Sequence, residues 1–405
     1  MTRVLFVVPP LVGHVNPTVA VGAALQDAGH EVAWTGHPDV VDPLLAPGSQ
    51  LLAVSETVPP DIAAKVASDG VGLRGPAALK FLWQDLLVPL ADQMLPGVER
   101  AVADFRPDVV VTDQQALAGA AVAEKHGLPW ATSATTSAEL VDPLAMLPKV
   151  AEWVRELITA FLGRAGLPAD IAATLDPRFS EHLVLAFSTP ELVGRDRVFP
   201  DHWAFVGPSI GARPAEVDFP WNRLRDDVPL VLISLGTLNH AAGERFFRVA
   251  ADAIAGLQVQ AVMVAPPQLI ADPPPNLLVQ ARVPQLALLP RAAAVVSHCG
   301  HNTVCETLAH GLPIVAAPIR DDQPMIADQV VAAGAGVRVR FGRVRPELLA
   351  DAIDTVLTDP RYAAAARAVA ASFTAAGGPG EAARRLVALA STTTPAYVPA
   401  TGERP

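Results

Sequence analysis

The stretch VVSHCGHNTVCETLAHG, residues 295–311, combines side chains and a turn that suit a phosphate-bearing ligand. Small apolar residues ending at His298 predict a β-strand, Gly300 allows a tight turn, and a helix is expected to begin near Asn302. Unpaired backbone N–H groups at a helix N-terminus attract anions. Asn302 and Thr303 add side-chain donors there. The stretch therefore predicts a diphosphate site at a strand–turn–helix junction.

Two further side chains extend this predicted site. Glu306 lies one helical turn beyond Asn302 on the same face, where its carboxylate can accept hydrogen bonds from ribose hydroxyls. His298 adds a donor that can be charged and would stabilise a departing diphosphate. Taken singly, Asn302 is more often a helix cap and Glu306 a solvated charge. It is their combination in one strand–turn–helix that favours a nucleotide diphosphate.

Zinc is the alternative ligand for the same stretch, because His298, Cys299, His301, Cys305 and His310 lie close together in sequence. His301 and Cys305 are four residues apart and could share a metal on one helical face. Structural zinc sites usually show paired short spacings such as C-x₂-C, which this stretch lacks. We therefore favour the diphosphate.

Transfer of a group to a hydroxyl needs a base and a partner that holds the tautomer of that base. His14, in PPLVGHVNP, follows the first predicted strand, and Asp113 closes the apolar run DVVVT. In an open α/β sheet both would overhang the same crevice. The turn lacks G-x-G-x-x-G, so no dinucleotide cofactor is expected. A lone loop histidine is usually structural, so these residues alone do not establish a base.

Short apolar runs alternate with amphipathic stretches, which predicts parallel α/β sheets in both halves. The predicted strands are Arg3–Val8, Glu31–Thr35, Gln50–Val54, Asp108–Thr112, Pro129–Ser133, Leu183–Phe187, and then Leu230–Ser234, Val259–Ala265, Leu277–Gln280, Ala293–Ser297, Ile314–Ala316 and Val337–Arg340. Helices are predicted at Asn16–Ala28, Pro76–Asp104 and Gln115–His126. The stretches 61–75 and 134–176 are expected to be irregular. Val206–Pro229, dense in Gly, Pro and charge, predicts an interdomain linker.

The composition limits the classes of partner. The 405 residues carry a formal net charge of −11, which argues against nucleic acid or an anionic membrane as a partner. Charged residues, Pro or Gly interrupt every apolar run well before the ~20 residues of a membrane span. Two cysteines exclude a disulfide framework and favour a cytoplasmic location. The start, MTRVLFVVPP, is expected to be a strand rather than a signal peptide.

The second-half motif makes a family resemblance specific. RVPQLALLPRAAAVVSHCGHNTVCETLAHGLPIVAAPIRDDQPMIADQV resembles the nucleotide-diphosphate-sugar motif of the GT-B-fold, UDP-glycosyltransferase-like superfamily, most of all the bacterial enzymes that glycosylate macrolide, enediyne and other polyketide antibiotics. The likeness extends from VVPPLVGHVNP to the helix after Arg345. It implies two Rossmann-like domains facing across a cleft, spanning 1–210 and 211–375. Residues 376–405 would add a helix near Glu381–Ala390 that crosses back onto the first domain and a poorly ordered tail after Thr392.

The resemblance also assigns roles to residues. His14 and Asp113 would be the catalytic dyad, while His298, Asn302 and Thr303 would contact the diphosphate and Glu306 the ribose. Asp322 and Gln323 would face the donor sugar, although Asp322 is also a candidate helix cap. The remaining donor-site residues implied by the resemblance are Ser234, Gly236 and Thr237 after the strand VLIS, Gly300 in the turn, and Arg282, Val283 and Gln285 of RVPQ.

Two positions depart from the pattern of the family. Arg282 stands where many members carry a Trp that stacks on the base, and a guanidinium plane can also stack on a base. His301 stands where plant members have Trp.

The acceptor pocket is expected from 61–87 and 134–147, whose Leu and Val residues, Phe81, Trp83 and Met146 suit an apolar acceptor.

The resulting expectation is a metal-independent, inverting glycosyltransferase without a cofactor. It would move a sugar, with a deoxysugar favoured, from a dTDP- or UDP-sugar to a hydroxyl of a small apolar natural product. Three alternatives stay open: a macrolide-inactivating self-resistance glucosyltransferase, a non-hydrolysing sugar-nucleotide epimerase, and a non-catalytic sugar-nucleotide-binding helper. A homodimer also stays open.

Overall fold

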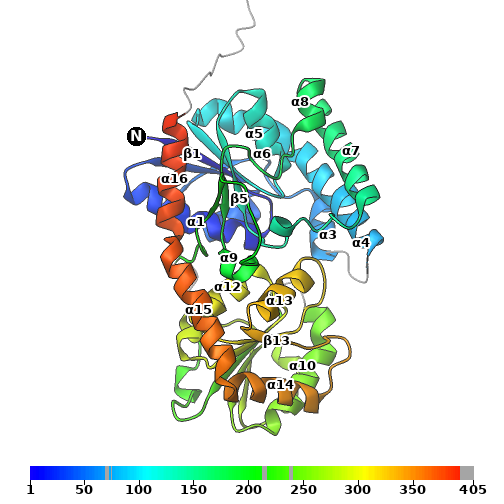
Figure 1. Cartoon of the computed structure of the whole chain (residues 1–405), viewed down its shortest axis with the longest axis vertical. Coiled ribbons are helices and arrows are strands. Elements are labelled where there is room, and N and C mark those ends of the chain that lie inside the picture. Colours follow the sequence, from blue (N-terminus) through cyan, green and yellow to red (C-terminus); the bar gives the residue numbers. More distant parts are fainter. Residues whose placement is uncertain (69–72, 74, 212–216, 237–239, 393–405) are drawn as a thin grey trace, which may run out of the picture.

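Two parallel sheets, each covered by helices on both faces, form two α/β domains (Figure 1). The computed structural model describes residues 1–68, 73, 75–211, 217–236 and 240–392. None of the helices in these ranges combines the length and the hydropathy that a membrane crossing needs. The expected division of the chain at 210 and 375 stays a prediction, and the tail after Thr392 lies outside the described residues.

The first sheet has the strand order β3-β2-β1-β4-β5-β6-β7. Its strands are β1 (Arg3–Val7), β2 (Glu31–Gly36), β3 (Gln50–Ala53), β4 (Val109–Asp113), β5 (Trp130–Ala134), β6 (Val184–Ala186) and β7 (Trp203–Phe205). Its helices are α1 (Val12–Asp27), α2 (Pro38–Val41), α3 (Pro60–Ser68), α4 (Pro76–Lys80), α5 (Val88–Phe105), α6 (Leu117–Lys125), α7 (Pro148–Arg164), α8 (Ala169–Thr174) and α9 (Pro190–Val193). A π-helical segment, Phe81–Leu87, joins α4 to α5.

The second sheet has the order β10-β9-β8-β11-β12-β13. Its strands are β8 (Leu230–Ser234), β9 (Gln260–Val264), β10 (Leu277–Gln280), β11 (Ala294–Ser297), β12 (Ile314–Ala316) and β13 (Gly336–Arg338). The remaining helices are α10 (His240–Ala255), α11 (Gln285–Leu288), α12 (His301–Ala309), α13 (Gln323–Ala332), α14 (Pro346–Thr358), α15 (Pro360–Ala376) and α16 (Gly378–Thr392). Short 3-10 turns lie at Asp42–Leu44, Glu139–Val141, Trp221–Arg223, Pro267–Leu269 and Leu289–Arg291.

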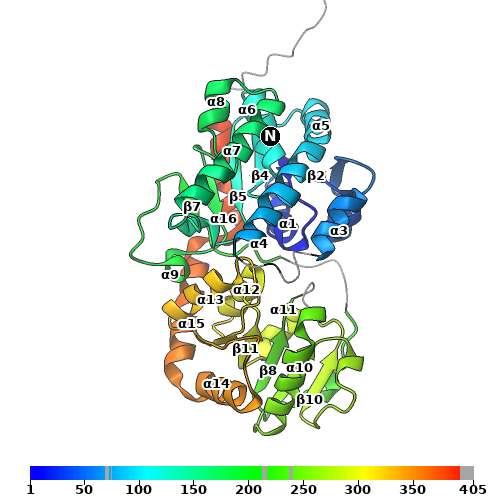
Figure 2. The ribbon, with the colours of Figure 1, turned by 90° about the vertical axis from the view of Figure 1, so that its right-hand side faces the viewer.

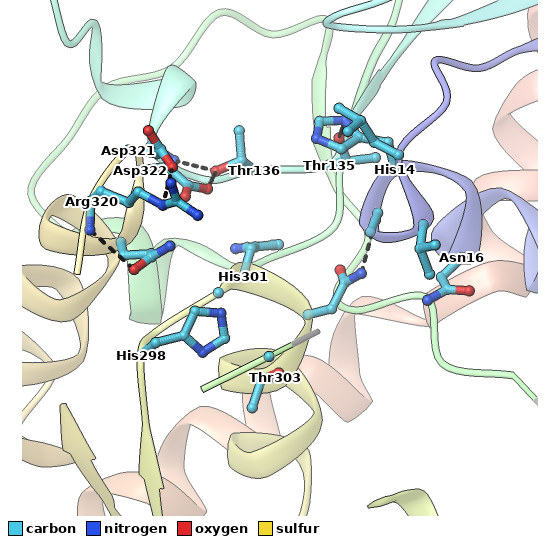
Figure 3. A pocket seen from close by; sticks show the side chains of 18 of the residues that line it. His14, Asn16, Thr135, Thr136, His298, His301, Thr303, Arg320, Asp321 and Asp322 are labelled. Atoms are coloured by element: carbon cyan, nitrogen blue, oxygen red, sulfur yellow. Dashed lines mark hydrogen bonds and ion pairs between the residues drawn. The ribbon is translucent and has the colours of Figure 1, made fainter. Parts of the chain in front are cut away.

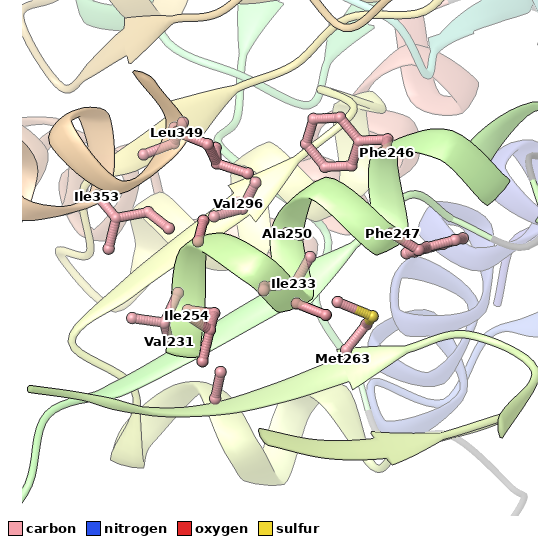
Figure 4. Close-up of a cluster of buried hydrophobic side chains, with 14 of the residues drawn as sticks. Val231, Ile233, Phe246, Phe247, Ala250, Ile254, Met263, Val296, Leu349 and Ile353 are labelled. Atoms are coloured by element: carbon pink, nitrogen blue, oxygen red, sulfur yellow. The ribbon is translucent and has the colours of Figure 1, made fainter. Parts of the chain in front are cut away.

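Successive side chains along each strand point to opposite faces of the sheet, so each face carries its own apolar core. On β1, Val4 and Phe6 pack toward α1, whereas Leu5 and Val7 pack toward α5 and α6. In the second domain, β8, β9, α10 and α14 share the apolar cluster of Figure 4. Burial on both faces explains why the strands are near-continuous apolar runs, and it leaves the loops at their carboxyl ends to carry polar groups.

The chain returns to its first domain at the end, as the resemblance implied. Helix α15 packs on α12 in the second domain, and a left-handed turn at Gly377 (φ 89°) separates it from α16. In α16, Ala382, Ala383 and Leu386 are buried with Val4 and Phe6 of β1. Figures 1 and 2 show this helical pair running along both domains.

Several boundaries correct the sequence prediction. Helix α1 begins at Val12 rather than at Asn16. Pro17 resembles a first-turn proline, which favours a start near Asn16, but it lies inside the helix. The stretches expected to be irregular contain α3, α7 and α8. In α7 the buried residues recur at helical spacing, at Val154, Ile158, Phe161 and Leu162. Strand β7 was not predicted either. In the linker, residues 217–229 hold only the turn Trp221–Arg223, and 212–216 lie outside the described residues.

Candidate active site

A cavity of about 2030 Å³ lies between the two domains and collects most of the predicted site residues (Figure 3). Thr237 lies outside the described residues. Asp113 is fully buried behind His14 rather than on the cavity wall. The predicted residues that line the cavity are His14, Ser234, Gly236, Arg282, Val283, Gln285, His298, Gly300, Asn302, Thr303, Glu306, Asp322 and Gln323.

His14 and Asp113 form a direct pair. His14 lies in the first turn of α1, and its Nδ1 is 2.9 Å from Oδ1 of Asp113, the last residue of β4. The same Oδ1 accepts the backbone N–H of Gln115 at 2.8 Å. Because a carboxylate only accepts, the proton of a neutral His14 is held on Nδ1, which leaves the Nε2 lone pair available to a substrate.

The surroundings of His14 favour its charged form. Burial by itself would lower the pKa of His14, but the Asp113 carboxylate outweighs it through its charge and hydrogen bond, and Asp322 adds a smaller effect. The net result is a pKa above the ordinary 6.5. His14 is therefore a stronger base than a free imidazole.

The turn between β11 and α12 is shaped around the His298 ring. Cys299, not Gly300, has the left-handed backbone (φ 68°), and its N–H donates to Ser297 Oγ at 3.0 Å. Gly300 is required for space instead. A Cβ there would lie 2.7 Å from His298 Nε2, and one on Gly236 would lie 2.8 Å from the same atom. The ring thus lies against two residues without side chains.

The surroundings of His298 favour its neutral form, whereas the sequence had left open whether this donor is charged. Its burial lowers the pKa to about 4, which the charge of Asp322 offsets only in part. Its Nδ1 is buried, with no hydrogen-bond partner among the described residues. A neutral imidazole can still donate one N–H to a phosphate oxygen.

Asn302 joins the start of α12 to the turn that carries His14. Pro17 has no N–H, so the helix cannot supply a donor to the carbonyl of Gly13, four residues earlier. Asn302 Nδ2 donates to that carbonyl at 2.8 Å, across the cavity. Thr303 also lines the cavity, but the described contacts include no hydrogen bond from its side chain to the first domain. The proline therefore creates the acceptor that links the two domains at this point.

Asp322 and Gln323 lie at the start of α13, and the side chain of Asp322 does not cap this helix. Asp322 occupies the cap position, but its side chain makes no capping bond and accepts from Thr136 Oγ1 at 2.7 Å (Figure 3). Gln323 Oε1 accepts the backbone N–H groups of Ile319 and Arg320 at 3.0 and 3.2 Å. Asp322 thus faces the first domain, while Gln323 fixes its own loop.

The RVPQ segment and Glu306 meet on the cavity wall. Gln285 Nε2 donates to Glu306 Oε2 at 2.5 Å, and the Glu306 side chain is buried. Val283 packs in the apolar cluster beneath β8. Arg282 is exposed on the cavity wall, where its guanidinium is accessible to a ligand. Ser234 ends β8 and its Oγ accepts the N–H of Gly236 at 3.4 Å.

The first-domain part of the cavity is mainly apolar, with one pair of oppositely charged side chains. Phe81 and Trp83 line it as predicted, whereas Met146 is 88% exposed and is not on its wall. Arg178 lies over the Trp83 ring at 5.5 Å and donates to Glu139 at 3.2 Å. Burial raises the pKa of Glu139, although Arg178 opposes this. No pattern in the sequence pointed to this pair.

The cluster considered as a zinc site has another arrangement. His301 Nε2 lies 3.2 Å from the carbonyl of Phe187 and 3.5 Å from Cys305 Sγ. Burial raises the pKa of the Cys305 thiol above its ordinary range. Within the described ranges, no three His, Cys, Asp or Glu side chains are grouped so as to hold a metal ion.

Thr135 and Thr136 were not predicted as site residues, yet both line the cavity directly after β5. Thr135 contacts both members of the His14–Asp113 pair, and Thr136 contacts Asp322. Their place at the carboxyl end of a central parallel strand is the signal that could have identified them.

Comparisons with known proteins agree with this fold. Residues 250–389 match the family model described as Erythromycin biosynthesis protein CIII-like, C-terminal domain. The chain is 30% identical to the demethyllactenocin mycarosyltransferase of Streptomyces fradiae, over 96% of this chain and 87% of that one.

Two solved structures are similar over nearly their whole lengths. The glycotransferase of kitacinnamycin has a TM-score of 0.75 and 26% identity, covering 96% of this chain and 99% of that one. The spinosyn rhamnosyltransferase, solved with spinosyn aglycone, has a TM-score of 0.75 and 25% identity, covering 96% and 100%.

Two facing Rossmann-like domains with this cavity between them define a GT-B glycosyltransferase, a hexosyl-transferring enzyme that uses a nucleotide-sugar donor. More narrowly, the chain belongs to the antibiotic-type glycosyltransferases of the UDP-glycosyltransferase-like superfamily.

Proposed function

We propose that this enzyme transfers a sugar from a dTDP- or UDP-sugar to a hydroxyl of a small apolar natural product, with inversion at the anomeric carbon. The observation that carries the proposal is the His14–Asp113 pair, 2.9 Å apart, beside the same cavity as the strand–turn–helix of residues 295–311. A base for the acceptor and a cradle for the leaving diphosphate thus share one cavity.

Each residue then has a defined task. His14 Nε2 takes the proton of the acceptor hydroxyl, while Asp113 holds the Nδ1–H and stabilises the imidazolium. The freed oxygen attacks the anomeric carbon as the bond to the diphosphate breaks. The α12 N-terminus, with Asn302, Thr303 and neutral His298, receives the developing negative charge. A single displacement inverts the anomeric centre, so an α-linked donor gives a β-glycoside.

The other assignments concern recognition. Asp322 and Gln323 would orient the donor sugar, Glu306 the ribose, and Arg282 the base. Ser234, Gly236 and Thr237 would border the phosphates. The mycarosyl and rhamnosyl groups in the names of the relatives are deoxysugars, which favours a deoxysugar here. The spinosyn aglycone named with one structure, and the apolar wall at Phe81 and Trp83, favour an apolar acceptor.

A mass-spectrometric screen of nucleotide sugars against a mixed panel of polyketide aglycones tests the proposal. A glycosylated aglycone whose mass gain matches the sugar is the expected product. Modification of finished macrolides alone would favour the self-resistance glucosyltransferase. The intact His14–Asp113 pair speaks against a non-catalytic helper. Turnover of a nucleotide sugar to its epimer without an acceptor would contradict the transferase.

The raised pKa of His14 predicts the acid side of the pH profile. A base must be unprotonated to act, so kcat/KM should fall as the pH drops through a value above 6.5. In Asp113→Asn the charge that raises the pKa is gone, and the acid limb should move to lower pH. Measuring kcat/KM from pH 5 to 9 for the unmodified enzyme and for Asp113→Asn tests the expected shift of the acid limb. An acid limb below 6.5 in the unmodified enzyme would contradict the assignment.

Activity is expected to survive chelation of metals. The sequence has no D-x-D pair to hold Mg²⁺ on a diphosphate, and α12 and His298 already face that position. The rate after exhaustive EDTA treatment should match the untreated rate, with no stoichiometric zinc in the purified protein. A loss of activity that one added metal restores would revive the metal interpretation of His298–His310.

A further inference from the structure

Thr135 touches both members of the proposed catalytic pair from a third segment of the first sheet. It directly follows β5, which pairs with β4 so that Ser133 lies opposite Asp113. Its side chain is buried, and its Oγ1 lies 2.8 Å from Asp113 Oδ2 and 2.8 Å from His14 Nδ1. The three side chains therefore form a closed triangle of contacts.

Proton counting fixes the direction of these bonds. A threonine hydroxyl has one proton and two lone pairs, and an ionised carboxylate has none to give. The Thr135 proton must therefore go to Asp113 Oδ2, which leaves a Thr135 lone pair directed at His14 Nδ1. Asp113 Oδ1 is already used by the Gln115 N–H at 2.8 Å and by His14. Both oxygens of a fully buried carboxylate are thus satisfied.

The same arrangement restricts the imidazole ring. Its Nδ1–H meets two acceptors, the Asp113 carboxylate and the Thr135 hydroxyl, so the tautomer with the proton on Nε2 is disfavoured. If the hydroxyl were absent, Oδ2 would be a buried carboxylate oxygen without its donor, which is costly. The carboxylate would then rotate or take up a proton, and either change would weaken its hold on His14.

We propose that Thr135 is a positioning residue that, together with Asp113, holds His14 with its Nε2 lone pair directed at the acceptor. The inference rests on the proposed role of His14 as the base. Thr136, its neighbour, contacts Asp322 on the donor side, so adjacent threonines serve the two halves of the site.

The test is a mutant cycle on one donor with two acceptors, an alkyl alcohol and a phenol. Thr135→Val, which keeps the shape, should lower kcat for the alcohol by about 10- to 150-fold, the range for a hydrogen bond to a charged group. The loss should be smaller for the phenol, which ionises more easily, and the KM of the donor should hold. Thr135→Ser, which keeps the hydroxyl, should recover most of the rate.

In a His14→Ala background, Thr135→Val should cause no further loss, because the residue acts through His14. An equal loss in both backgrounds, no loss at all, or a Ser variant as slow as Val would overturn the proposal. Full activity of His14→Ala alone would instead remove the base itself, so the two failures are distinguishable. If Thr135→Val does not fold, Thr135→Ala takes its place in the cycle. For each variant, a nucleotide-induced rise in Tm verifies an intact donor site.

Discussion

Replacing His14 by alanine is expected to lower kcat by about 10²- to 10⁴-fold, the usual contribution of a positioned general base. The acceptor hydroxyl would have to lose its proton to water, and no other described ring nitrogen is paired with Asp113. Steady-state kinetics with an alkyl alcohol acceptor measure this, and the KM of the donor should change little. Asp113→Asn should also slow transfer, because an amide cannot stabilise an imidazolium as a carboxylate does.

The chain offers a matched control for this experiment. His126 also pairs with a carboxylate, Glu99, at 2.6 Å, but it lies outside the cavity. His126→Ala removes a histidine–carboxylate contact without touching the site, and kcat should stay within a factor of about two. Full activity of His14→Ala on the alcohol would remove His14 from the mechanism.

UDP or dTDP, without any metal, is expected to stabilise the protein by about 2.7 kcal/mol at 100 times its Kd. The diphosphate would meet the α12 N-terminus, Asn302 and His298, so a nucleoside without phosphates should give much less. A thermal melt with each ligand measures the difference. Glu306→Ala should weaken nucleotide binding, whereas Asp322→Ala should spare free nucleotide and impair only the sugar-bearing donor.

Glycine variants sharpen the same test. Gly300→Ala places a Cβ 2.7 Å from His298 Nε2, so the ring must move and the nucleotide-induced shift should shrink or vanish. Gly163→Ala, in α7, meets no atom within 4 Å and should keep the full shift. If no nucleoside diphosphate raises the Tm of the unmodified protein at millimolar concentration, the donor-site assignment fails.

The strand–turn–helix of residues 295–311 could be predicted because its signals are local. A strand, a turn and a helix start lie within 17 residues, 295–311, and the apolar runs of the second domain match its strands closely. What was missed depends on contacts between distant segments. Thr135 with His14, Thr136 with Asp322, and Asn302 with Gly13 join residues more than 100 positions apart.

Two local features also have physical causes. Pro17 marks a helix start by rule, but here it lies inside α1, where Asn302 supplies the hydrogen bond that the proline cannot. The sequence left the charge of His298 open, because a donor that faces an anion can be charged. Burial dominates in the structure, and the pKa of about 4 leaves the ring neutral near pH 7.

The packing of α16 against α1 and the first sheet joins the N-terminal residues of the protein to a helix near its C-terminus. Leu386 completes the apolar face that Val4 and Phe6 begin, yet it is synthesised about 180 residues after the last strand of that sheet. At about 5–20 residues per second, a ribosome needs roughly 9–36 s to cover that interval. During that time the first domain is made, but the apolar face of its sheet that α1 covers lacks the part of its cover that α16 supplies. The newly made chain therefore offers an apolar surface to chaperones until α16 emerges.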